Sequence, residues 1–122
     1  RVEGFAKEEE WGRAYEEINN MEMEMTQSGI LLIKYFLVID KDEQLKRFKD
    51  REENKPYKLT EEDWRNRDKW DNNTLAINEM LDKTSTPLAP WEVIGANDKK
   101  YARIKVLETF VDKVTRALEE QE

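Results

Sequence analysis

The sequence predicts an α/β fold in which helices flank a small parallel sheet. Two short apolar segments, residues 30–39 and 91–94, have the β-branched and aromatic composition of strands. Segments with helical periodicity precede, separate and follow them, and strands that alternate with helices pair in parallel. The first strand is almost continuously apolar, which is typical of a strand covered on both faces.

Composition narrows the class of function. The chain has 122 residues, of which 38% are hydrophobic and 40% charged, and its net charge is −7. That length predicts one domain at most, and the periodic segments argue against the disorder that high charge favours. The acidic balance disfavours nucleic-acid binding, which rests on cation–phosphate contacts. Without Cys or His, a disulfide, a zinc–thiolate site and a Ser-His-Asp triad are excluded.

The first helix is expected over residues 7–27, because apolar side chains recur there at steps of three and four. These side chains should form one buried face: Trp11, Tyr15, Ile18, Met21 and Met25. The alternating methionines Met21, Met23 and Met25 are expected to fill the core. Gly29 suits the left-handed residue that closes a helix.

A second helix should follow the first strand, over residues 41–53. Asp40 is its expected N-cap, with Glu43 completing a capping box. The helix should bury Leu45 and Phe48 and present its cations to solvent: Lys46, Arg47, Lys49 and Arg51.

Residues 54–58 are expected to form a loop. Thr60 and Asp63 then make a second capping box, opening a helix through Trp64 and Trp70. Another helix is expected around residues 72–83.

A stiff loop over residues 84–90 contains Pro87 and Pro90 and leads into the second strand. Asn97 or Asp98 caps the last helix, which has the most regular apolar stripe in the chain. We expect that stripe to be buried: Ile104, Leu107, Phe110, Val111, Val114 and Leu118.

Two strands are too few for an open parallel sheet. The chain also begins with Arg1 and shows no signal peptide, so we expect a piece of a longer chain. An exposed sheet edge would allow it to form a homo-oligomer. The longest mostly apolar run, residues 30–39, is too short to span a membrane.

Charge is divided unevenly along the chain. Residues 7–25 hold seven acids and two bases, whereas residues 46–58 hold six bases and three acids. A basic cluster on an acidic protein suits a compact polyanion such as phosphate, although charge alone favours a solvated helix face with internal ion pairs. The sequence has no Gly-rich phosphate loop. The acids at 61–63 are expected in the first turn of a helix rather than in acid–base catalysis.

Four segments resemble the polyphosphate kinase 2 family, in order and at similar spacing. They are RVEGFA at residues 1–6, IDKDEQLKRF at 39–48, KLTEEDWRNRDKWD at 58–71 and TPLAPWEVIGANDKKYAR at 86–103. The resemblance implies the C-terminal part of a P-loop kinase-like fold related to thymidylate kinase, with a helical lid insertion and few strands. It also implies a cytoplasmic enzyme that moves phosphate between inorganic polyphosphate and a nucleoside mono- or diphosphate with Mg²⁺.

The same resemblance implies a lid over residues 42–83 and a last core strand and helix over 91–120. The phosphate-binding loop and the magnesium-binding segment would lie upstream, so no catalytic residue or metal ligand is expected here, and the fragment should be inactive alone. Seven lid residues become candidate phosphate contacts: Arg47, Arg51, Lys55, Lys58, Arg65, Arg67 and Asp71. Tyr57 and Asn72-Asn73 depart from the family pattern, so the exact lid contacts and the nucleotide preference stay open.

Two other functions remain open at this point. A non-catalytic binding or regulatory module would dock a protein partner on the acidic, Met-bearing helix 7–27. An ATP-dependent kinase of the thymidylate kinase type would use a different phosphate donor. The acceptor (AMP, ADP or GDP), the number of kinase domains in the parent protein and the oligomeric state are also undetermined.

Overall fold

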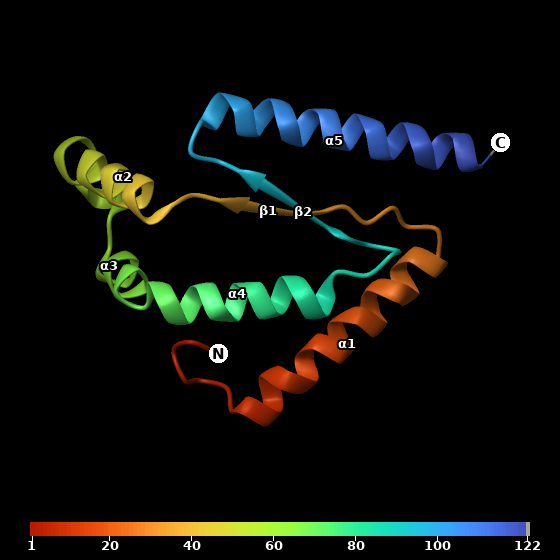
Figure 1. Cartoon of the computed structure of the whole chain (residues 1–122), viewed down its shortest axis with the longest axis horizontal. Helices are drawn as coiled ribbons and strands as arrows, with labels where there is room; N and C mark the ends of the chain where they lie inside the picture. Colours follow the sequence, from red (N-terminus) through yellow and green to blue (C-terminus); the bar gives the residue numbers. More distant parts are fainter. Residues whose placement is uncertain (122) are drawn as a thin grey trace.

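The structure is a computed structural model that describes residues 1–121. Helices and two strands alternate along the chain (Figure 1). The elements are α1 (Glu8–Gln27), β1 (Lys34–Val38), α2 (Lys41–Asn54), the 3₁₀ turn η1 (Pro56–Lys58), α3 (Glu61–Asp68), α4 (Trp70–Thr84), β2 (Trp91–Gly95) and α5 (Lys99–Glu120).

The two strands pair in parallel, which confirms the predicted fold class. Their register runs from Lys34 opposite Trp91 to Val38 opposite Gly95. Helix α5 lies on one side of the sheet, and α1 and α4 lie on the other (Figure 1). The predicted strand over 30–39 is too long: residues 30–33 are unpaired, because β2 has only five residues to offer as partners.

Complete cover of β1 was also expected and is not found in the described residues. Leu37 remains 53% exposed and Val38 40% exposed, because β1 is paired on one edge only. The sheet core on the α5 side is small: Ile94, Ala96 and Ala102 are buried, with Tyr35, Ile39 and Val106 packed against them.

The predicted helix caps are largely confirmed. Asp40 caps α2 by accepting the Glu43 N–H at 2.7 Å, but Glu43 does not complete a capping box. Thr60 and Asp63 form the full reciprocal box at the start of α3. Of the two residues proposed to cap α5, Asp98 does so, accepting the Tyr101 N–H at 3.0 Å.

The helix predicted to run through Trp64 and Trp70 is in fact two helices. Lys69 separates α3 from α4, so Trp70 belongs to α4. The predicted loop at 54–58 contains the short turn η1, which Pro56 opens.

The buried face of α1 differs from the predicted one. Met21 and Met23 are 54% and 42% exposed, so they do not fill the core, whereas Glu22 is buried. The reason lies in β1: the ammonium of Lys34 is buried beneath α1, and a buried charge requires a counter-charge.

The apolar stripe of α5 is likewise mostly exposed rather than buried. Leu107, Phe110, Val111 and Leu118 are each at least half exposed. The helix instead turns its smaller side chains, such as Ala102, toward the sheet. Leu107, one residue of the stripe, lines a shallow groove together with Leu37 of β1. No helix within residues 1–121 is long and apolar enough to cross a membrane.

Candidate functional site

The carboxyl ends of β1 and β2 lead into a hydrogen-bonded junction. The backbone N–H of Asp40 donates to Asn97 Oδ1 at 3.1 Å, and Asn97 Nδ2 donates to Asp40 Oδ2 at 2.7 Å. The hydrogen bond from the Glu43 N–H, and after it the one from the Asn97 side chain, lower the pKa of the Asp40 carboxyl. Ligands of parallel α/β sheets bind at this edge, so the residues around the junction form the candidate site.

Arg47 joins α2 to the end of β2 and is not the solvent-exposed cation that the sequence predicts. Its side chain is only 22% exposed. Its Nη2 donates to the carbonyls of Ala96 at 2.7 Å and Asn97 at 3.2 Å, and its Nε donates to Glu43 at 3.1 Å. A guanidinium carries five N–H donors, so Arg47 retains some for another acceptor.

Arg67 has a comparable role between α3 and α2. Its Nη1 donates to the carbonyl of Lys41 at 2.7 Å and to Gln44 Oε1 at 3.2 Å. The same two helices pack through an edge-to-face contact between Phe48 and Trp64, with ring centroids 5.1 Å apart. Helices α2 and α3 therefore form one unit, which positions the remaining cations.

Arg51, Lys55 and Lys58 lie at the end of α2 and in η1 and have no anionic partner among the described residues. The same holds for other cations of the unit: Lys41, Lys46, Lys49 and Arg67. The guanidinium of Arg51 lies 5.9 Å from the centroid of the Phe48 ring. Lys55 and Lys58 are exposed at the end of α2 and in η1. These three side chains can approach an added polyanion without first breaking an ion pair.

Arg65 is already paired with an acid from the start of the chain. Its Nε lies 3.4 Å from Glu3 Oε1, and Lys69 Nζ lies 3.2 Å from Glu3 Oε2. The hydrogen bond from Lys69 and the charge of Arg65 lower the pKa of the Glu3 carboxyl. The sequence places Lys69 among the cations near Arg65, but it gave no sign that both pair with Glu3, more than 60 residues away.

Asp71 lies exposed in the first turn of α4, with no bonded partner among residues 1–121. Within that same range, no three acidic side chains gather into a group that would hold a metal ion.

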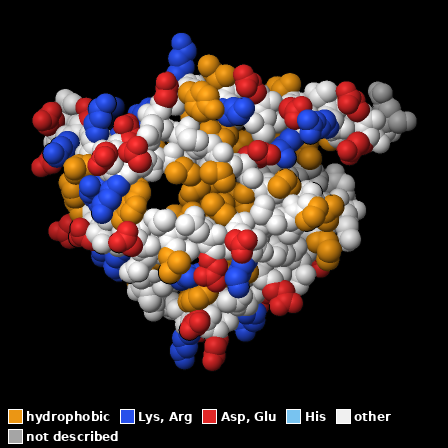
Figure 2. Space-filling view, in the orientation of Figure 1, with side chains coloured by type: hydrophobic (Ala, Val, Ile, Leu, Met, Phe, Trp, Pro, Cys, Tyr) orange, Lys and Arg blue, Asp and Glu red, His pale blue; other side chains and the backbone are white. Residues whose placement is uncertain are grey.

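A cavity of about 710 Å³ separates the sheet from α4. Apolar side chains line it from both sides, including Phe36 and Val93 of the strands and Ile77 of α4. Asp40 and Asn66 are among the polar residues of its lining. Figure 2 shows a hollow bordered by hydrophobic side chains, beside the end of the molecule where α2 and α3 present a mixture of cations and acids.

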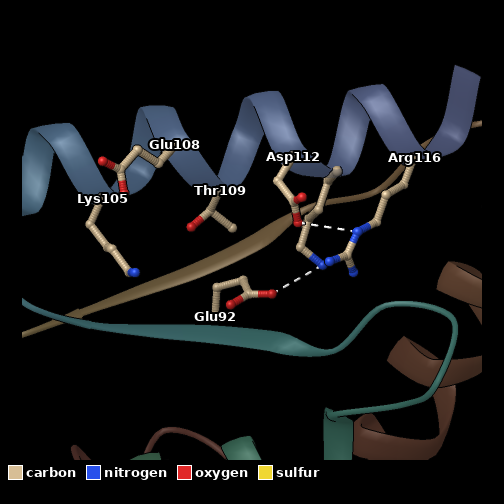
Figure 3. A pocket seen from close by; sticks show the side chains of 7 residues that line it. Glu92, Lys105, Glu108, Thr109, Asp112 and Arg116 are labelled. Atoms are coloured by element: carbon tan, nitrogen blue, oxygen red, sulfur yellow. Dashed lines mark ion pairs between the residues drawn. The ribbon is translucent and has the colours of Figure 1, made fainter.

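A second groove, of about 340 Å³, lies between β2 and α5 and contains none of the predicted site residues. Side chains of α5 point toward Glu92 across it (Figure 3). Lys113 pairs with Glu92 at 3.0 Å, and Arg116 pairs with Asp112 at 3.4 Å. The lining holds three acids and three cations, and two of the cations are paired, so the groove has no surplus charge for a polyanion.

A buried polar cluster at the opposite end of the strands was also missed from sequence. We call it the Lys34 cluster; its members are Glu22, Lys34, Thr84 and Trp91. Lys34 Nζ lies 2.9 Å from Glu22 Oε2 and donates to the carbonyl of Thr84. The only sequence signal was a lysine within the apolar run 30–39, which identifies no partner.

The architecture defines the class of protein: an α/β structure, consistent with a P-loop kinase-like fold, with a cation-bearing helical unit between its two parallel strands. The model of the polyphosphate kinase 2 family matches residues 1–122, and the chain belongs to that family.

Curated relatives agree with this assignment. The chain is 51% identical over 119 residues to a polyphosphate:AMP phosphotransferase of Pseudomonas aeruginosa, covering 96% of this chain and 24% of the relative. It is 55% identical over 113 residues to a polyphosphate:AMP phosphotransferase of Acinetobacter johnsonii, covering 91% and 24%. The chain thus spans about a quarter of the length of these relatives.

Solved structures match over most or all of the chain. A polyphosphate kinase 2 of Pseudomonas aeruginosa superposes with a TM-score of 0.95 at 49% identity, covering 100% of this chain and 27% of that one. Polyphosphate kinase 2 of Arthrobacter aurescens TC1 superposes with a TM-score of 0.85 at 37% identity, covering 88% and 39%.

Proposed function

We propose that the protein carrying this chain transfers phosphate between inorganic polyphosphate and a nucleotide, and that residues 42–83 form a lid over the phosphates. The observation that carries the proposal is a group of cations without anionic partners, Arg51, Lys55 and Lys58, gathered at the end of α2 and in η1 of an otherwise acidic protein. Phosphoryl transfer requires such charges, because negative charge spreads over the oxygens of the transferring group.

The acceptor we propose is AMP. Relatives named polyphosphate:AMP phosphotransferase are 50–55% identical to this chain. Relatives named for NDP or GDP are 34–38% identical. The greater similarity to the AMP enzymes supports AMP over a nucleoside diphosphate.

The remaining lid residues receive different parts in this proposal. Arg47 and Arg67 would add a phosphate contact while keeping their carbonyl partners, since each guanidinium has N–H donors to spare. Arg65 would exchange Glu3 for phosphate. Asp71 would orient phosphate or metal at the start of α4.

We propose Mg²⁺ as the metal of the reaction. Apart from the part given to Asp71, we place its ligands in the segment upstream of this chain, since no three acidic side chains gather within residues 1–121. A cytoplasmic location is part of the proposal, since nucleotide substrates are available there. The isolated chain is expected to be inactive. Detectable phosphotransfer by the purified 122-residue chain would contradict that expectation.

Calorimetric titration of the chain with polyphosphate, at low and moderate salt, tests the lid assignment. The triple variant Arg51→Ala/Lys55→Ala/Lys58→Ala should weaken binding at least about tenfold, because each charge-assisted hydrogen bond contributes roughly 1.5–3 kcal/mol. The control is the double variant Lys46→Ala/Lys49→Ala, which removes two exposed lysines of α2. Because it removes one charge fewer than the triple variant, the loss of affinity is compared per charge removed, and the loss in the control should be small.

Equal loss of affinity per charge removed in both variants would indicate non-specific attraction and overturn the lid assignment. Binding should also weaken with added salt, since exposed charges are screened. No binding of the unaltered chain at either salt concentration would contradict the claim that these cations suffice for a polyphosphate contact.

One observation favours a second function, docking of a protein partner on α1. Ile18, Met21 and Met23 are exposed on that helix among its glutamates, and flexible methionines suit adaptable binding surfaces. The triple variant Ile18→Ser/Met21→Ser/Met23→Ser separates the two functions: it should leave polyphosphate binding unchanged if the lid carries that activity.

A further inference from the structure

The Lys34 cluster is the most completely buried polar group in the described part of the chain. Lys34, Glu22 and Thr84 are 7%, 8% and 1% exposed. The four members come from α1, β1, the end of α4 and the start of β2. The cluster therefore joins four elements at the amino ends of the strands, at the opposite end of the sheet from the candidate site.

The contacts of the cluster converge on the last turn of α4. The final carbonyls of a helix have no partner within it. Here the carbonyl of Lys83 accepts from Asn19 Nδ2 at 2.8 Å, and the carbonyl of Thr84 accepts from Lys34 Nζ. Trp91 Nε1 donates to Thr84 Oγ1 at 2.9 Å. A positive charge is favourable at this end of a helix, because the helix dipole is negative there.

The other end of α4 adjoins the α2–α3 unit, the part of the proposed lid that carries the candidate phosphate contacts. Its first residue, Trp70, follows α3 directly, and its 15 residues extend about 22 Å. Between its ends, α4 faces the 710 Å³ cavity rather than packing tightly on the sheet. The position of α4 relative to the sheet is therefore determined mainly at the ends of the helix and by α1.

A buried ion pair is not required for stability alone, since well-packed apolar side chains often stabilise a core equally well. An apolar side chain, however, has no hydrogen-bond donor, so it cannot bind one particular carbonyl. The ammonium of Lys34 selects the carbonyl of Thr84, and Glu22 neutralises the remaining charge. This combination specifies where α4 ends against β1.

We propose that Lys34 is a positioning residue for the lid: through the carbonyl of Thr84 it holds α4 in place, and so sets how far the lid cations lie from the carboxyl edge of the sheet. This inference rests on the proposed function. Lys34 touches neither substrate in this scheme and acts only through α4.

The test uses the full-length protein that carries this sequence and the variant Lys34→Met/Glu22→Met, which replaces the ion pair with an apolar pair of similar length. The KM for polyphosphate should rise about tenfold or more, because small misplacements of binding groups are costly. The thermal midpoint should stay near that of the unaltered protein. An unchanged KM for polyphosphate in this folded variant would overturn the proposal.

The charge swap Glu22→Lys/Lys34→Glu separates the ion pair from the contact with α4. It restores opposite charges but places a carboxylate against the carbonyl of Thr84, so the KM should remain raised. Full recovery of the KM would show that any ion pair suffices and would overturn the proposal. The variant Lys83→Met is the matched control: it removes a lysine from the same turn of α4 whose side chain is 53% exposed, and its KM should be unchanged.

A distance measurement keeps the inference testable without enzymatic activity. These 122 residues contain no cysteine. In the full-length protein, with every cysteine outside them replaced by serine, spin labels at Glu61→Cys on α3 and Lys105→Cys on α5 report one distance; both positions are exposed. Lys34→Met/Glu22→Met should shift or broaden that distance, and Lys83→Met should not. An unchanged distance would overturn the inference, whereas a shift in a protein without polyphosphate-dependent transfer would overturn only the proposed function.

Discussion

The two ends of the parallel sheet differ in how their charges are held. At the amino ends, Lys34 and Glu22 are buried and paired, and each neighbouring element contributes a contact. At the carboxyl ends and in the adjoining helical unit, Arg51, Lys55 and Lys58 are without anionic partners among the described residues. The comparison teaches that charge serves structure where it is desolvated and satisfied, and is available for a ligand where it is solvated and unpaired.

The largest expected effect comes from breaking the buried pair on one side only. Lys34→Met leaves the carboxylate of Glu22 buried without its cation, which should lower the free energy of unfolding by about 3–5 kcal/mol. Urea denaturation measures this change. Lys83→Met should shift the free energy by no more than about 0.5 kcal/mol. Similar losses in both variants would remove the distinction between buried and exposed lysines.

The next effect tests what holds the helical unit together. Phe48 is the buried residue of α2 and packs on Trp64. Phe48→Ala should cost about 3 kcal/mol, at the lower end for loss of a buried aromatic side chain. Hydrogen exchange should show lost protection in α2 and α3, with β1 and β2 little changed. Equal loss of protection in both regions would show that the two ends of the sheet are not independent.

A smaller effect is expected at the cap of α3. Thr60→Ala removes one half of the capping box and should cost about 1 kcal/mol. Thr115→Ala is a control, since Thr115 is exposed within α5. Thermal unfolding of both variants measures the difference, which should vanish if the box contributes nothing to the helical unit.

The smallest expected effect is a dependence on pH at the carboxyl ends. The pKa values of Glu3 and Asp40 are lowered in the folded chain. A lowered carboxyl pKa contributes stability that is present above the unfolded value of roughly 4 and is lost as the pH falls through the folded value. In the variant Glu3→Gln/Asp40→Asn, the free energy of unfolding should depend less steeply on pH below about pH 5. Denaturation at each pH measures the free energy of unfolding. If its dependence on pH were the same in the variant, Glu3 and Asp40 would contribute nothing to the loss of stability in acid.

Much of the fold could be predicted from short sequence patterns. The N-terminal caps of three helices, at Asp40, Thr60 and Asp98, could be predicted from sequence. Each cap depends on a residue only three positions further along the chain. The parallel pairing followed from the alternation of helices and strands. The break between α3 and α4 lies at Lys69, before Trp70, whereas the sequence predicted it after Trp70. The reason is that Trp70 fits the apolar pattern of either helix.

The candidate site was less predictable. Arg47 and Arg51 read alike in sequence, one helical turn apart, yet Arg47 binds the carbonyls of Ala96 and Asn97 whereas Arg51 has no anionic partner in the described chain. Whether an arginine of α2 is hydrogen-bonded within the fold therefore depends on its distance from the end of β2, about 50 residues further along the chain. The seven predicted phosphate contacts therefore remain proposals, ranked by the structure according to whether a partner already occupies them.

The sequence by itself determined the order of the elements, the helix caps and the family, since these depend on local spacing and on recognisable segments. Only the tertiary structure decided which face of α1 is buried, which face of α5 is exposed and how Lys34 is satisfied. The physical reason is separation along the chain: Lys34 is 12 residues from Glu22 and 50 from Thr84, and Lys69 is 66 residues from Glu3. Contacts over such distances are fixed by packing and by the need to pair buried charges, which no local pattern encodes.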